Sequence, residues 1–219
     1  MLIARPTRHA AGIQLFGDAF DLESLHETIH HLCESSILVT HMEDYVLGLA
    51  YEVRKAFEGN RLKESFETGP DEKVEYYGVQ LLWPQYLAQI ALLRYAASSK
   101  PTNHEHQSNL YRLEHITLEA LVEIDEKIAG LIFKILPGLA ALNTHEYLFQ
   151  FIDSMTMEYV TEFKTKQERV KELPVTLLSL SPTSPPYADF KKMMNKLATK
   201  AGCSPLELEE NEEWPDFEW

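Results

Sequence analysis

Apolar residues recur every three or four positions over much of this chain, which is the spacing of one face of an α-helix. The first series predicts a helix from about residue 21 to 34, and it consists of Leu22, Leu25, Ile29 and Leu32. The second predicts a helix from about 42 to 58, and it consists of Met42, Val46, Leu49, Val53 and Phe57. Asp21 is the expected N-cap of the first helix, and Gly59-Asn60 ends the second.

Short apolar runs near the start of the chain follow a different pattern. Leu2 to Ala4 and Ile13 to Phe16 flank a segment that contains proline and glycine, which predicts a β-hairpin. Residues 74–83 are rich in strand-forming side chains and can add a third strand to this hairpin. Residues 60–73 contain Gly69-Pro70-Asp71 and are expected to form a loop.

The rest of the chain has a helical pattern. It predicts helices at about 84–98, 107–127, 128–136 and 144–170. After a proline-rich loop at 181–186, a last helix is expected with Ser184 as its cap, Pro185 in its first position and Gly202 just past its end. The predicted fold class is therefore α+β, mainly α, with a small N-terminal hairpin packed on a multi-helix bundle. We expect one domain at 1–205, with a possible subdivision at 98–106, and a separate tail at 206–219.

Composition narrows the class of protein. The 219 residues are 45% hydrophobic and 25% charged, which is typical of a folded soluble protein. The formal net charge is −14, and no basic footprint for nucleic acid is visible. The densest basic stretch, Lys164-Thr165-Lys166 with Arg169 and Lys171, fits a solvated helix face. The longest apolar run is too short and interrupted to cross a membrane. Two cysteines and no signal peptide favour the cytoplasm, and Cys33 is expected to be a buried core thiol.

Residues 206–219 form an acidic-aromatic tail. They contain seven acids and no base, which is half of the net charge. Trp214, Phe217 and Trp219 lie among these acids and are candidate partner-binding residues. We expect this segment to be disordered on its own. Its rings can fill a pocket of a protein partner or of another subunit, or they can dock on the chain's own surface.

Residues 26–30 read His26-Glu27-Thr28-Ile29-His30, an H-E-x-x-H motif on a predicted helix. Two histidines at i and i+4 can share a zinc ion, and Glu27 can then act as general base on the metal-bound water. A catalytic zinc needs a third protein ligand, and nothing in the sequence selects one. The alternative is a chance match in a chain that is rich in histidine and glutamate.

Several blocks of the first half are similar to those of a known family. They are Thr7…Gly12-Ile13…Gly17-Asp18…Asp21-Leu22…Leu25…His30, the segment Tyr45–Ala56 followed by Gly59-Asn60-Arg61, and Leu82-Trp83-Pro84-Gln85-Tyr86-Leu87. In this order they resemble an uncharacterised bacterial family, a domain of unknown function, over about residues 1–98. The resemblance implies no activity. It marks His30, Arg54 and Trp83 as positions to test. It also implies that the His26-Glu27 part of the motif occurs by chance.

The leading hypothesis is therefore a non-enzymatic, cytoplasmic interaction or structural protein without a cofactor. Its expected partner is a protein or a second copy of the chain, and neither nucleic acid nor membrane. The alternative is a zinc-dependent hydrolase in which His26 and His30 bind the metal and Glu27 is catalytic. A third hypothesis is a helical domain that binds a small ligand, because pockets are invisible in a sequence.

Overall fold

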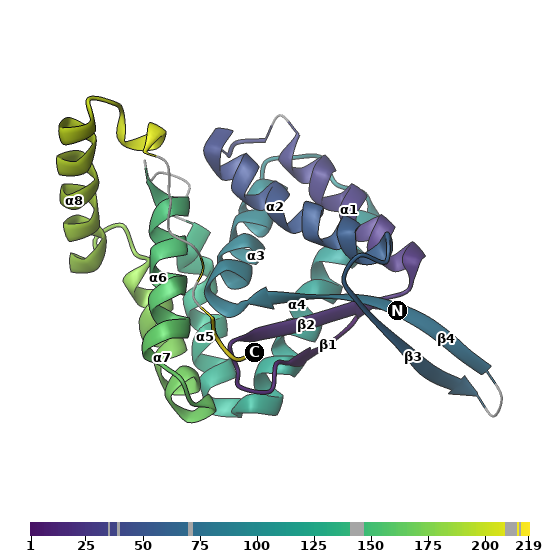
Figure 1. Cartoon of the computed structure of the whole chain (residues 1–219). Helices are drawn as coiled ribbons and strands as arrows, with labels where there is room; N and C mark the ends of the chain where they lie inside the picture. Colours follow the sequence, from purple (N-terminus) through teal and green to yellow (C-terminus); the bar gives the residue numbers. More distant parts are fainter. Residues whose placement is uncertain (35, 39, 70–71, 141–146, 209–213, 215) are drawn as a thin grey trace.

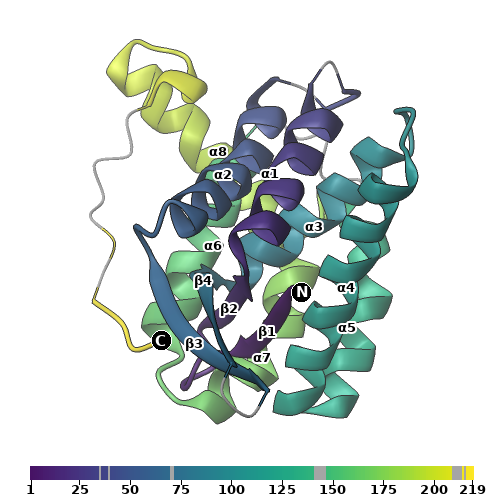
Figure 2. The ribbon, with the colours of Figure 1, turned by 90° about the vertical axis from the view of Figure 1, so that its right-hand side faces the viewer.

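An antiparallel sheet lies against a group of helices in the computed structural model (Figures 1 and 2). The structure describes the chain except residues 35, 39, 70–71, 141–146, 209–213 and 215. The strands are β1 (Ile3–Pro6), β2 (Gly12–Gly17), β3 (Leu62–Gly69) and β4 (Glu72–Leu82), in the order β1-β2-β4-β3. The predicted N-terminal hairpin and the strand at 74–83 are confirmed, as is the mainly α, α+β class.

Strand β4 joins two parts of the sheet. Its second half pairs with β2, with Leu81 opposite Ile13, and its first half pairs with β3. The β3–β4 ribbon extends beyond the helices (Figure 1). The loop predicted for residues 60–73 was therefore wrong over 62–69 and over 72–73, where β4 begins. Leu62, Glu64 and Phe66 share one face of β3, so alternation is weak in the sequence, and the backbone pairing with β4 makes this segment a strand.

The described part of the chain contains eight α-helices. They are α1 (Ala19–Cys33), α2 (Thr40–Phe57), α3 (Trp83–Ala97), α4 (His104–Ile124), α5 (Glu126–Leu139), α6 (Leu148–Glu162), α7 (Lys166–Ser179) and α8 (Pro185–Ala201). The caps predicted for α8 are confirmed, since the Ser184 side chain accepts from the Tyr187 N–H and Gly202 has a φ of 73°. None of these helices is long and apolar enough to span a bilayer.

Several helix boundaries differ from the prediction because polar side chains cap the backbone at other positions. Helix α1 is capped by Asp18, not Asp21, and begins at residue 19. Asn103 accepts from the backbone of His106, so α4 begins within the segment expected to be a linker. The single helix predicted for 144–170 is two helices, because Thr165 and Glu168 form a capping box that starts α7. Residues 144–146 lie outside the described part.

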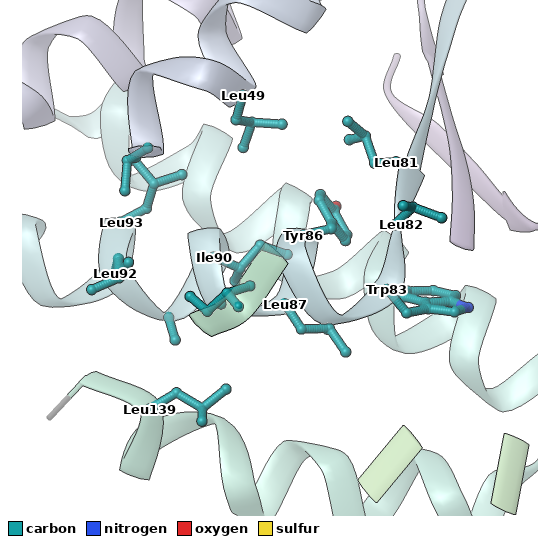
Figure 3. Packing of buried hydrophobic residues seen from close by; sticks show 14 of the residues in the cluster. Leu49, Leu81, Leu82, Trp83, Tyr86, Leu87, Ile90, Leu92, Leu93 and Leu139 are labelled. Carbon is teal, nitrogen blue, oxygen red and sulfur yellow. The ribbon is translucent and has the colours of Figure 1, made fainter. Parts of the chain in front are cut away.

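Helix α3 is the centre of the molecule. It is apolar around its circumference, as expected for a helix covered on all sides. Leu49 of α2 lies on one side of it and Leu139 of α5 on the other, while Leu81 and Leu82 of β4 lie near its first turn (Figure 3). The buried apolar residues of both halves of the chain, from Leu2 to Met194, form one contiguous cluster.

Candidate functional site

A buried arginine organises the place where α6 ends and α7 begins. Thr165 caps α7, which puts Arg169 in its first turns with its side chain facing inward; this residue is only 1% exposed. Its guanidinium donates to four backbone carbonyls in three separate segments. They are Val160 (3.2 Å) and Phe163 (2.6 Å) at the end of α6, His9 (3.2 Å) in the β1–β2 turn, and Glu218 (2.6 Å) in the tail.

The tail therefore has defined contacts with the body of the protein. The Arg169 Nη1 donates to the Glu218 carbonyl, and the His9 N–H donates to the Trp219 carbonyl over 2.8 Å. The imidazole of His9 lies 3.5 Å from the Glu218 carboxylate. We call these four residues, His9, Arg169, Glu218 and Trp219, the tail junction. Figures 1 and 2 show the end of the chain beside the sheet and the lower ends of α6 and α7.

The aromatic residues of the tail do not share one environment. Phe217 and Trp219 are half-buried, contact each other with ring centroids 5.1 Å apart, and pack against the hydrophobic core. Trp214 is 44% exposed. A groove of about 420 Å³ lies beside the junction, lined in part by Lys164, Arg169 and Phe217. The two rings nearest the end of the chain thus contact their own protein, while the third presents apolar surface to solvent.

The β1–β2 turn is shaped to meet this junction. Ala10 is 1% exposed and has a φ of 55°, a left-handed conformation that non-glycine residues rarely adopt. Its carbonyl accepts from the Tyr159 hydroxyl over 2.9 Å. Burial lowers the pKa of Arg169, whereas the nearby Tyr159 and Glu218 raise it. A buried guanidinium is tolerated here because carbonyl oxygens surround it.

The sequence did not reveal Arg169 as a site residue. We expected it on a solvated helix face with Lys164 and Lys171, and this was wrong for Arg169, because the break between α6 and α7 turns its side chain inward. The capping box Thr165-x-x-Glu168 was the signal that could have shown the start of a new helix.

The H-E-x-x-H motif lies on α1 near the surface. His26 and His30 are adjacent, with ring centroids 4.4 Å apart, while Glu27 and His30 are exposed. Burial, His30 and the charge of Arg54 lower the pKa of His26, and Glu23 and Glu58 oppose this shift. In the described part of the chain, no three His, Cys, Asp or Glu residues are placed to hold a metal. The hydrolase hypothesis thus lacks its third ligand there.

The three positions marked by the family resemblance lie in different environments. Trp83 is fully buried in the core, and no described group accepts from its indole N–H. Arg54 is half-buried on α2, with its Nε 3.7 Å from a Glu58 carboxylate oxygen and its guanidinium 5.3 Å from the Tyr51 ring. Arg54 is close enough to affect His26, whereas Trp83 belongs to the core and not to this surface.

Comparison with known proteins extends the resemblance. No curated protein and no solved structure is significantly similar to this chain. A family model for a domain of unknown function, DUF6904, matches residues 2–219, which is nearly the whole chain and not only the first 98 residues. The chain therefore belongs to the DUF6904 family, whose function is unknown.

Proposed function

We propose that this protein is a non-enzymatic interaction module that binds an acidic-aromatic peptide at the tail junction. We further propose that copies of the chain self-associate by exchanging their tails. The observation that carries this proposal is the pair of main-chain bonds from the body to the tail, from Arg169 to the Glu218 carbonyl and from the His9 N–H to the Trp219 carbonyl. Main-chain bonds combined with pockets for side chains are a common way to bind peptides.

Charge supports an acidic ligand at this place. Lys164 and Arg169 are the charged residues that the body contributes to the groove beside the junction, while the acids that line it, Asp216 and Glu218, belong to the tail. Both bases belong to the densest basic stretch of the sequence. The tail carries seven acids and no base. Such complementarity favours association and selects the partner. Because every copy has the same tail and the same junction, contacts made within one chain can also form between two chains.

The partner in this proposal is a protein. A chain with a net charge of −14 repels nucleic acid and anionic lipid surfaces. Its two cysteines, Cys33 and Cys203, are both free. Free thiols are typical of a reducing compartment, so a cytoplasmic location is part of the proposal.

The test uses the full-length chain and a fluorescent peptide of residues 206–219. In the double variant Phe217→Ala/Trp219→Ala, the chain's own tail competes less well for the junction. We therefore expect the peptide to bind the double variant more tightly than the wild type in fluorescence anisotropy. A peptide with the same two substitutions is expected not to bind. Trp214→Ala is the matched control, since this ring is exposed.

Light scattering during gel filtration tests the exchange of tails. We expect wild type and Trp214→Ala to form dimers or larger assemblies, and the double variant to be a monomer. If the wild type is a monomer at all concentrations but the peptide binds, the exchange is wrong and the peptide site stands. If the peptide binds neither chain, the proposed function is wrong.

A further inference from the structure

A second cleft, of about 460 Å³, lies between α2, α3, α6 and β4, with Trp219 of the tail on its wall. Its volume is within the range of small-molecule sites. None of the described residues that line it is a lysine, arginine or histidine, while three are acids, Asp44, Glu52 and Asp153. Glu52 is already paired with Arg61, through two hydrogen bonds of 2.8 and 3.0 Å.

Two acceptors in this cleft lack a full set of donors. Gln89 is 8% exposed, and its Nε2 donates to the Tyr45 carbonyl over 3.0 Å. Among the described residues no group donates to the Oε1 of Gln89. The Asp153 carboxylate accepts one hydrogen bond, from Gln85 Nε2 over 2.7 Å, and the described residues provide no further donor. An amide oxygen of a largely buried residue and a carboxylate thus remain available to a ligand that donates hydrogen bonds.

No described residue provides a counter-ion for Asp153 in this cleft. Burial raises the pKa of Asp153, and the hydrogen bond from Gln85 only partly opposes this. Burial, and next the charge of Asp153, raise the pKa of Tyr45, whose hydroxyl donates to the Gln85 carbonyl. An ionised carboxylate that is partly removed from water and unpaired favours the arrival of a cation.

Aromatic residues complete the lining. Tyr45, Tyr86 and Trp219 line the cleft, and of these three Tyr45 and Trp219 are half-buried and present ring surface, whereas Tyr86 is fully buried. Figure 3 shows Tyr86 near Leu49 and Leu81, which line the same cleft. The Tyr86 hydroxyl is bonded to Thr117 over 2.9 Å, so its polar end is already satisfied. Aromatic rings together with carboxylates are the groups that recognise organic ammonium ions. A bare metal ion fits less well, because no three described His, Cys, Asp or Glu residues converge on one point.

We propose that this cleft binds a small organic cation, a primary ammonium group on a compact apolar body. The ammonium group lies against Asp153 and the Gln89 carbonyl oxygen, and the apolar body lies against the aromatic wall. The inference does not rest on the exchange of tails, because the body provides all the described lining residues except Trp219.

The test is calorimetric titration of the full-length protein with four compounds of nearly equal shape. Benzylamine and benzyltrimethylammonium are cations at neutral pH, benzyl alcohol is neutral, and benzoate is an anion. We expect benzylamine to bind, benzyltrimethylammonium, which has no N–H group, to bind more weakly, and the other two compounds not to bind. Asp153→Asn keeps the acceptor for Gln85 but removes the charge, and it is expected to weaken binding of the cations about tenfold or more.

Asp189→Asn on α8 is the matched control, because this exposed residue is remote from the cleft lining and pairs with Lys192. It is expected to bind the cations as the wild type does. Asp153→Asn is also expected not to lower the melting temperature, since it removes a partly buried charge that lacks a partner. The proposal is overturned if neither cation binds, if benzyl alcohol binds as well as benzylamine, or if Asp153→Asn changes only the melting temperature.

Discussion

The histidine pair of α1 and the tail junction differ in how visible they are in the sequence. His26 and His30 form a motif within five residues, yet at the surface they have only each other as possible metal ligands among the described residues. Arg169 is part of no motif, yet it joins α6, the β1–β2 turn and the tail. One helix can align two side chains, whereas a site needs groups from several segments. Convergence of distant segments is thus the better sign of a functional place.

The largest expected effect is a loss of stability when the tail junction is changed. In Arg169→Met, buried and partly buried carbonyls of three segments lose their donor, so we expect the free energy of unfolding to fall by about 3–5 kcal/mol. Urea unfolding measures it, with Arg112→Met on the exposed face of α4 as control. Equal midpoints for both variants would show that the junction does not hold the fold together.

A smaller effect concerns pH and the histidines of α1 and α4. Burial lowers the pKa of His26 and of His106. As the pH falls through about 6.5, the unfolded chain binds protons that these folded histidines resist, so stability is lost on acidification. We expect His26→Gln to reduce this loss between pH 7.5 and 5 in urea unfolding, and His26→Gln/His106→Gln to reduce it further. The same pH dependence in all three proteins would contradict this assignment.

The smallest effect is expected for the histidine motif itself. His30 is exposed, so His30→Ala is expected to change the free energy of unfolding by less than about 0.5 kcal/mol. Added zinc is expected not to raise the melting temperature, because two ligands do not make a structural or catalytic site. Native mass spectrometry that finds one zinc per chain, lost in His30→Ala, would support the hydrolase hypothesis and show that the histidine pair is part of a metal site.

Much of the fold followed from local patterns. The N-terminal hairpin, helices α1 to α3 and the caps of α8 were predicted, because apolar spacing and capping residues act within a few positions. Cys33 was expected in the core and is fully buried, which raises the pKa of its thiol to about 12. Strand β3 was not predicted because its alternation is incomplete. The helix predicted for 144–170 was not divided, because apolar spacing alone does not show where a capping box starts a new helix.

The sequence by itself determined the helical class, the acidic tail and its aromatic residues, since these depend on composition and short-range spacing. Only the tertiary structure decided that Arg169 is buried and that Phe217 and Trp219 contact the chain's own surface. It also decided that Asp153, Gln89 and the aromatic wall share one cleft. The physical reason is that burial and pairing depend on residues up to 210 positions apart, as between His9 and Trp219, which no local pattern encodes.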